Sequence, residues 1–254
     1  MPLPTKRTDP LVRFEDYTKI IYGPPGIGKS TWCSQIENAL FLGTDPGLKA
    51  LSVYLEIIDD WDKAQAKYRE IKVGGHFYTT VVIDDLGGLQ RLALKKAAKD
   101  AGKPHPIDVK FREAYTKAND MVLDLVRAFA QLEGIGLVVT AHDRIEEMQG
   151  STGPYDRKTI GVIDDKKRMA EINLIGFADM VLCCELKRIP KEGGDQGFDF
   201  KRVIRTAPSP YLVAKDRTGF VPDEIDLKEE GGYQFVKDAF EENLTAKSRE
   251  SAGE

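Results

Sequence analysis

Residues 23–30 read Gly-Pro-Pro-Gly-Ile-Gly-Lys-Ser and fit the pattern G-x-x-x-x-G-K-[ST]. The preceding segment, 17–23, is a short apolar run that ends at glycine, which predicts a strand, and residues 28–38 predict a helix. A glycine-rich turn between a strand and a helix is the setting in which this pattern binds phosphate groups. Successive backbone N–H groups curl inward there, and the helix N-terminus is electropositive.

The residue types of this loop suit a nucleotide bound with Mg²⁺. Lys29 is expected to reach the β and γ phosphates, and the Ser30 hydroxyl is expected to be a ligand for Mg²⁺. A mere tight turn is the alternative, and the strand–loop–helix context argues against it. The predicted nucleotide-binding residues are Gly23, Pro24, Pro25, Gly26, Ile27, Gly28, Lys29, Ser30 and Thr31.

Strands and helices alternate along the first part of the chain. The predicted strands are 17–23, 39–44, 79–84 and 135–141, and the predicted helices are 28–38, 61–72, 88–99 and 109–133. Repeated strand–helix units with continuous apolar strands predict an α/β fold with a mostly parallel central sheet flanked by helices.

The pattern loosens after His142. Residues 143–165 are polar and predict a long loop, and later apolar runs predict an antiparallel extension at the sheet edge. These later strands are 178–187, 198–206 and 210–214, with GGDQG at 193–197 as a hairpin turn. The domain prediction is an N-terminal arm at 1–16, a core at 17–227 and an acidic polar tail at 228–254.

A carboxylate for the metal follows the run Val81-Val82-Ile83. Asp84 stands at the C-terminal end of this buried strand, where it can hold Mg²⁺ together with Ser30. A strand that ends in Asp at a turn is common, but the position about 55 residues after Lys29 in an alternating chain favours the metal role.

Two carboxylates are candidates for the base that activates water. Asp85 directly follows Asp84, and Asp45 follows the second strand. Ligands of open α/β sheets bind at the carboxyl ends of the strands, so both can face the γ-phosphate. The alternatives are a turn residue before Pro46-Gly47 for Asp45 and a helix cap for Asp85.

Three further residues are predicted to act on the site. His142, at the tip of the strand 135–141, is a candidate sensor of the γ-phosphate, with a solvated strand end as the alternative. Lys215 and Arg217 follow a predicted strand. They are candidates for an arginine finger that enters a neighbouring subunit's site, with a charged hairpin tip as the alternative.

Composition excludes several classes of protein. Apolar residues make up 41% of the 254 residues and charged residues 31%, which is typical of globular proteins. No stretch approaches 18 consecutive apolar residues, so no membrane span is expected, and the N-terminus lacks a secretory h-region. Cys33, Cys183 and Cys184 form no CxxC pair and are expected to be buried thiols in a reducing cytoplasm.

The net charge of −4 is unevenly distributed. Residues 223–254 carry ten acidic and four basic groups, and residues 1–222 carry 33 basic and 31 acidic groups. The main part of the chain is therefore near neutral, which neither demands nor forbids a polyanionic partner.

The segments GPPGIGKST, ALFLGTDPG, TVVIDDL, LVVTAH and LVAKDRTG occur in an order that resembles the RecA-like phage ATPases described as phage nucleotide-binding proteins. Some members of that family are single-strand-annealing recombinases related to archaeal RadA-type proteins. The resemblance covers about 17–227. It implies a RecA-like P-loop NTPase fold, ATP and Mg²⁺ as ligands, and assembly into a ring or filament.

The resemblance also implies roles for individual residues. Lys29, Ser30 and Asp84 would bind the nucleotide and Mg²⁺, and His142 would be the sensor. Asp45 would activate water, and Lys215 and Arg217 would act in trans. Relatives usually carry Glu where this chain has Asp45, and the shorter arm predicts slower hydrolysis or a transfer of the role to Asp85.

Single-stranded DNA is the expected partner, and two segments are candidates for binding it. Residues 91–112 carry seven basic and two acidic groups, and residues 143–168 follow the sensor directly. The alternative for the first is a solvated helix face. Phe111, Tyr115 and Tyr155 are available to stack on bases.

The first functional hypothesis is a DNA-stimulated, slow ATPase of phage recombination or replication, in the cytoplasm of a phage-infected or prophage-carrying bacterium. The second is a helicase-loader-like ATPase that remodels a protein partner, such as a replicative helicase or a single-strand-binding protein. The third is a nucleotide-dependent binding module that hydrolyses little. A small-molecule kinase is disfavoured because no second substrate motif is visible.

Overall fold

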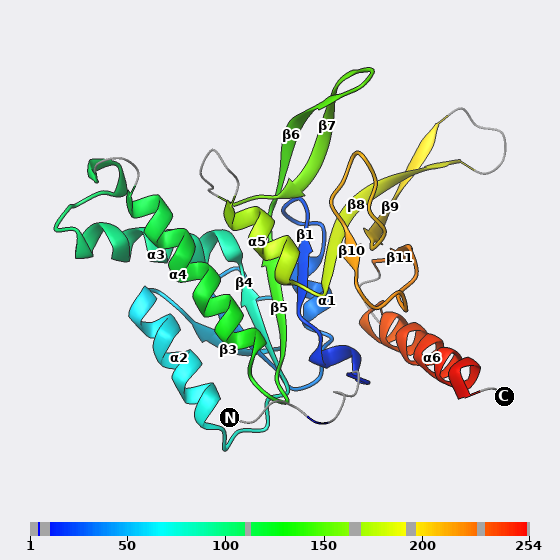
Figure 1. The fold of residues 1–254 in the computed structure, drawn as a ribbon, viewed down its shortest axis with the longest axis horizontal. Coiled ribbons are helices and arrows are strands. Elements are labelled where there is room, and N and C mark those ends of the chain that lie inside the picture. Colours follow the sequence, from blue (N-terminus) through cyan, green and yellow to red (C-terminus); the bar gives the residue numbers. More distant parts are fainter. Residues whose placement is uncertain are drawn as a thin grey trace.

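The computed structural model describes residue 5 and residues 11–109, 113–162, 169–191, 197–227 and 232–252, without the side chains of 169–171 and 248–252. Most strands of the described part belong to one nine-stranded sheet with the order β11-β9-β8-β1-β5-β4-β2-β3, and β10 also pairs with β8 (Figure 1). The strands are β1 (Lys19–Tyr22), β2 (Ala39–Gly43), β3 (Tyr54–Ile57), β4 (Thr80–Asp84), β5 (Gly136–Ala141), β8 (Met180–Pro190), β9 (Phe198–Arg205), β10 (Lys215–Asp216) and β11 (Glu224–Asp226).

The pairing of the strands confirms the predicted fold class. The neighbours of β1, β2 and β4 all pair in parallel, whereas β8–β9, β9–β11 and β8–β10 are antiparallel. The protein therefore has an α/β fold with a mostly parallel central sheet and a C-terminal antiparallel extension. β1, β2, β4 and β5 are buried over their whole length apart from Asp84, as their continuous apolar runs predict.

Helices cover both faces of the sheet (Figure 1). They are η1 (Phe14–Asp16), α1 (Lys29–Cys33), α2 (Trp61–Val73), α3 (Leu86–Asp100), η2 (Pro106–Asp108), α4 (Glu113–Ala130), α5 (Met169–Phe177) and α6 (Gly232–Ala252). Ile20 and Tyr22 of β1 join the core formed with α2, α3 and α4, and Ile21 joins the core formed with α1 and α6. This alternation is the period of two that a strand imposes on its side chains.

Three predicted elements were wrong. The helix predicted at 28–38 ends at Cys33. Beyond it, the backbone N–H groups of Gln35 and Ile36 donate to the carbonyl oxygens three residues earlier, of Trp32 and Cys33, which is the tighter hydrogen-bond pattern of a 3₁₀ turn. The loop predicted at 143–165 contains a projecting hairpin, β6 (Asp143–Gly150) and β7 (Gly153–Ile160). The strand predicted at 210–214 forms only isolated bridges at Leu212, and the pairing with β8 begins at Lys215.

Parts of other predictions lie outside the described residues. They are Lys110, Phe111 and Arg112 in the basic segment, residues 163–168 of the predicted loop, and most of the GGDQG turn. Within the described part of the chain, every helix is too short or too polar to cross a membrane. Cys33, Cys183 and Cys184 are buried free thiols, as predicted, and the latter two face opposite sides of the sheet.

The acidic C-terminal segment is a helix that packs on the core. Tyr233, Val236 and Phe240 of α6 are at most 3% exposed. The ring of Phe240 lies 5.5 Å from that of Phe14 and 5.4 Å from that of Phe220. The predicted domains, with 228–254 as an acidic polar tail, stay a prediction, and the sequence did not predict that α6 packs on the core.

We predict that Phe240→Ala lowers the free energy of unfolding by about 3–5 kcal/mol, because it removes a fully buried ring and leaves a cavity. Phe235→Ala on the same helix is the matched control. Its side chain is 52% exposed, so the loss should stay below about 1 kcal/mol. Urea unfolding followed by tryptophan fluorescence measures both. Equal losses in the two variants would contradict the packing of α6.

Candidate active site

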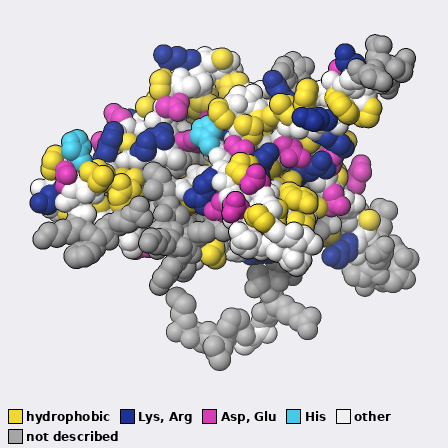
Figure 2. Space-filling view, turned by 90° about the horizontal axis from the view of Figure 1, so that it is seen from above, with side chains coloured by type: hydrophobic (Ala, Val, Ile, Leu, Met, Phe, Trp, Pro, Cys, Tyr) yellow, Lys and Arg dark blue, Asp and Glu magenta, His cyan; other side chains and the backbone are white. Residues whose placement is uncertain are grey.

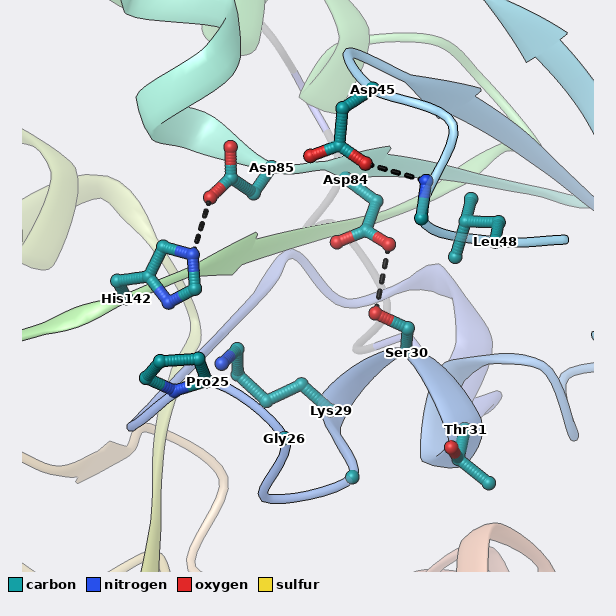
Figure 3. Close-up of a pocket in the computed structure, with 12 residues that line it drawn as sticks. Pro25, Gly26, Lys29, Ser30, Thr31, Asp45, Leu48, Asp84, Asp85 and His142 are labelled. Carbon is teal, nitrogen blue, oxygen red and sulfur yellow. Dashed lines mark hydrogen bonds and ion pairs between the residues drawn. The ribbon is translucent and has the colours of Figure 1, made fainter. Parts of the chain in front are cut away.

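A cavity of about 250 Å³ opens at the carboxyl ends of the central parallel strands. Loops after β1, β2, β4 and β5 meet there, and Figure 3 shows their side chains converging. The lining residues are Pro25, Gly26, Gly28, Lys29, Ser30, Thr31, Asp45, Gly47, Leu48, Asp84, Asp85 and His142. The sequence thus predicted most of this lining, whereas Gly47 and Leu48 were not predicted to line it.

The glycine-rich loop has the curled backbone that a phosphate cradle needs. Gly23, Gly26 and Gly28 have φ of 155°, 73° and 111°. A Cβ on Gly23 would lie 2.5 Å from the carbonyl oxygen of Cys184, so the close packing of the loop on β8 requires glycine there. Ile27 is 4% exposed and anchors the loop in the core.

Lys29 folds back over this loop. Its Nζ donates to the carbonyl oxygens of Gly23, at 2.8 Å, and Pro24, at 3.0 Å. Burial lowers the pKa of Lys29, which is 7% exposed. The ammonium group is therefore held by backbone oxygens at the mouth of the loop, where phosphate oxygens are suitable alternative acceptors.

Asp84 of β4 is connected through its carboxylate to helix α1 and to strand β5. Its Oδ2 accepts a hydrogen bond of 2.8 Å from Ser30 Oγ, and its Oδ1 accepts one from Thr140 Oγ1. A hydroxyl and a carboxylate oxygen at this separation are hard ligands of the kind that Mg²⁺ prefers. Ser30 and Asp84 therefore fit the predicted metal site. Thr140 lies within the predicted strand 135–141, and no sequence pattern marked its contact with Asp84.

Asp85 has two partners. Its Oδ1 accepts from the backbone N–H of Gly88 at 2.7 Å and caps α3, and its Oδ2 lies 3.2 Å from His142 Nε2. The carboxylate is only 11% exposed, whereas the His142 side chain is 52% exposed. The sequence alternative of a helix cap is thus realised, and Asp85 also joins the cavity to the candidate sensor (Figure 3).

Asp45 lies on the other wall of the cavity and is exposed. Its Oδ1 accepts from the backbone N–H of Gly47 at 2.7 Å, which is the turn geometry considered from the sequence. Between the two carboxylates, Thr44 Oγ1 accepts from the backbone N–H of Asp85 at 3.2 Å. Both candidate bases therefore reach the same cavity.

Lys215 and Arg217 lie away from this cavity. Lys215 pairs with Val181 of β8. Val181 in turn pairs with Ile20, which lies two residues before the end of β1. Its Nζ donates to carbonyl oxygens near the C-terminus of α5, of Ile175, Gly176 and Ala178, at 2.6–3.0 Å. Arg217 pairs with Asp179 at 3.0 Å. Neither side chain lines its own chain's cavity, and their action in trans stays a prediction.

A family model for the AAA domain matches residues 15–218. The chain belongs to the AAA domain family. Among solved structures, it is similar to a RadB recombinase at 15% identity and a TM-score of 0.47, covering 86% of this chain and 90% of that one. It is also similar to the KaiC-like protein PH0186 from Pyrococcus horikoshii OT3 at 14% identity and a TM-score of 0.38, covering 75% and 78%. None of the curated proteins matches.

The family assignment depends on the AAA domain match alone. This AAA domain contains the complete G-x-x-x-x-G-K-[ST] loop, from Gly23 to Ser30, with Asp84 hydrogen-bonded to its serine. The protein is therefore a P-loop NTPase by family and by the arrangement of its loop.

We predict that Thr140→Val lowers the free energy of unfolding by about 1–3 kcal/mol, because the partly buried Asp84 carboxylate loses a hydrogen-bond donor. Thr80→Val on the adjoining strand is the matched control. The Thr80 hydroxyl is buried without a hydrogen-bond partner in the described part of the chain, so its loss should not destabilise. Urea unfolding measures both variants, and a neutral Thr140→Val would contradict the assigned contact.

Proposed function

We propose that the protein is a Mg²⁺-dependent ATPase that acts on single-stranded DNA in phage recombination or replication, within the cytoplasm of a bacterial host. The observation that carries the proposal is the convergence of Lys29, the Ser30–Asp84 pair and two further carboxylates on one cavity. Phosphoryl transfer requires this combination of a cation, a metal site and a residue that orients water.

Each group has a distinct part in the proposed reaction. Lys29 leaves its carbonyl partners to bind the β and γ phosphates, while the backbone N–H groups of the curled loop bind the phosphate oxygens. Ser30 and Asp84 hold Mg²⁺, which when bound offsets the negative charge that develops on the phosphates. Thr140 keeps the Asp84 carboxylate oriented towards Ser30.

Asp45 is the proposed base for the attacking water, and the Asp85–His142 pair is the proposed sensor. Asp45 is exposed on the cavity wall, which leaves room for water beside it. Asp85 is engaged by the N-terminus of α3 and by His142. His142 directly precedes the projecting β6–β7 hairpin, so a change in this pair is transmitted to a surface element.

The first test measures phosphate release from Mg-ATP with and without a dT oligonucleotide. We expect the oligonucleotide to raise the rate, and Lys29→Ala to reduce it to the background because the phosphate-binding cation is lost. No stimulation together with no salt-sensitive oligonucleotide binding would overturn the DNA part. Stimulation by a replicative helicase or a single-strand-binding protein alone would favour the partner-remodelling alternative instead.

The second test separates the two carboxylates. We expect Asp45→Asn to lower kcat by about 10²–10⁴-fold, since the amide cannot accept a proton. Its oxygen can still accept from Gly47, so the melting temperature should not change. Asp85→Asn is the matched control because asparagine also caps a helix. If Asp85→Asn loses turnover and Asp45→Asn keeps it, the base is Asp85.

A further inference from the structure

The antiparallel pair β8–β9 extends beyond the rest of the sheet as a two-stranded ribbon (Figure 1). Residues directly opposite each other in such a pair share a face, and every second residue returns to it. The register places Pro190 opposite Phe198, Arg188 opposite Phe200, and Leu186 opposite Arg202. These six residues form one face, named here the ribbon face.

The ribbon face is apolar and exposed. Leu186, Phe198 and Phe200 are 53%, 57% and 62% exposed, although burial of such side chains is favourable. Phe198 and Phe200 are two residues apart on one strand, so their rings repeat at about 7 Å. Adjacent exposed apolar side chains of this size mark an interaction surface.

The charges differ between the two sides of the ribbon. On the opposite side, Lys187 pairs with Glu224 and Lys201 pairs with Asp226. The six residues of the ribbon face include two arginines and no carboxylate. Flat rings together with a guanidinium group are complementary to a polyanion with exposed bases.

The inner end of the ribbon face adjoins the nucleotide cavity. Arg202 Nη1 lies 3.9 Å from the position that a Cβ on Gly28 would take, and Leu227 lies 3.5 Å from the same position. Leu227 donates its backbone N–H to the carbonyl oxygen of Arg202 at 3.0 Å, which fixes this corner. The ribbon face is therefore continuous with the phosphate-binding loop.

We propose that the ribbon face binds single-stranded nucleic acid, with Phe198 and Phe200 stacked on bases and Arg188 on the phosphodiester backbone. The inference rests on the proposed function and names the surface that takes the strand. A ring spacing of about 7 Å corresponds to about two steps of a stacked strand, and paired bases inside a duplex offer no face to these rings.

The experiment measures binding of a fluorescein-labelled dT oligonucleotide by anisotropy across a salt series, with its duplex as a second probe. Phe200→Leu keeps an apolar side chain but removes the flat ring, and Phe200→Trp restores one. The matched control is Phe77→Leu. Phe77 is also an exposed aromatic residue, at 55%, but it lies beside Tyr54 of β3 and away from the ribbon face. Since all three sites are exposed, the variants should keep the wild-type fold, which circular dichroism checks.

We expect Phe200→Leu and Phe198→Leu each to weaken dT binding about fivefold or more with an unchanged salt slope. Phe200→Trp and Phe77→Leu should bind like the wild type. Arg188→Ala should weaken binding and reduce the slope of log K against log salt by about 0.7, as for one lost phosphate contact. The duplex should bind more weakly than the single strand.

Three outcomes would overturn the proposal. Wild-type affinity in the Phe198→Leu, Phe200→Leu double variant would exclude the ribbon face while leaving the proposed function intact. If Lys95→Ala weakens dT binding and the ribbon-face variants do not, the nucleic acid lies instead along the basic cavity of about 840 Å³ beside α3. If the wild type binds no dT and the phenylalanine variants instead abolish self-association in sedimentation, the occupant is a second copy of the chain, and the DNA part of the proposed function fails as well.

Discussion

The carboxylate of Asp84 accepts hydrogen bonds from the hydroxyls of Ser30 and Thr140, and these two contacts position the site. β5 lies between β1 and β4 in the sheet, so the loop after β1 and the end of β4 are not direct neighbours. Asp84 bridges this distance by contacting β5 and the phosphate-binding loop together. A partly buried carboxylate is stabilised by hydrogen bonds, and here those bonds fix the relative position of three chain segments.

A second carboxylate extends this arrangement to the surface. Asp85 caps α3 through Gly88 and contacts His142, the residue before β6. A Cβ on Gly88 would lie 1.8 Å from Thr44 Oγ1, so the first turn of α3 packs directly on the loop after β2. The cavity is thus in contact, through Asp85 and His142, with a long helix and with a projecting hairpin (Figure 1). Figure 2 shows the molecule from above, on a face where hydrophobic, basic and acidic side chains are mixed.

The sequence was sufficient for β1, β2, β4 and β5 and for most of the cavity, but it did not predict β3, and it assigned β8, which pairs in parallel with β1, to the antiparallel extension. Continuous apolar runs mark β1, β2, β4 and β5 without ambiguity, and the residues that follow those strands must meet at one edge. The β6–β7 hairpin was missed because polar residues occupy both of its sides. Its sequence therefore shows neither the apolar period of a strand nor that of a helix. The packing of α6 was missed because charged residues surround Tyr233, Val236 and Phe240, and the contact of Thr140 depends on tertiary structure alone.

The contact between α6 and α1 joins segments that are far apart in the chain. Tyr233 donates its backbone N–H to Gln35 Oε1 at 3.0 Å, across 198 positions, and its ring lies 5.0 Å from that of Trp32. At usual rates of translation, α6 leaves the ribosome about 10–40 s after α1. During this interval the helix that carries Lys29 lacks one of its packing partners. The nascent chain therefore reaches a fully supported nucleotide site only late in its synthesis, and truncated products lack that support.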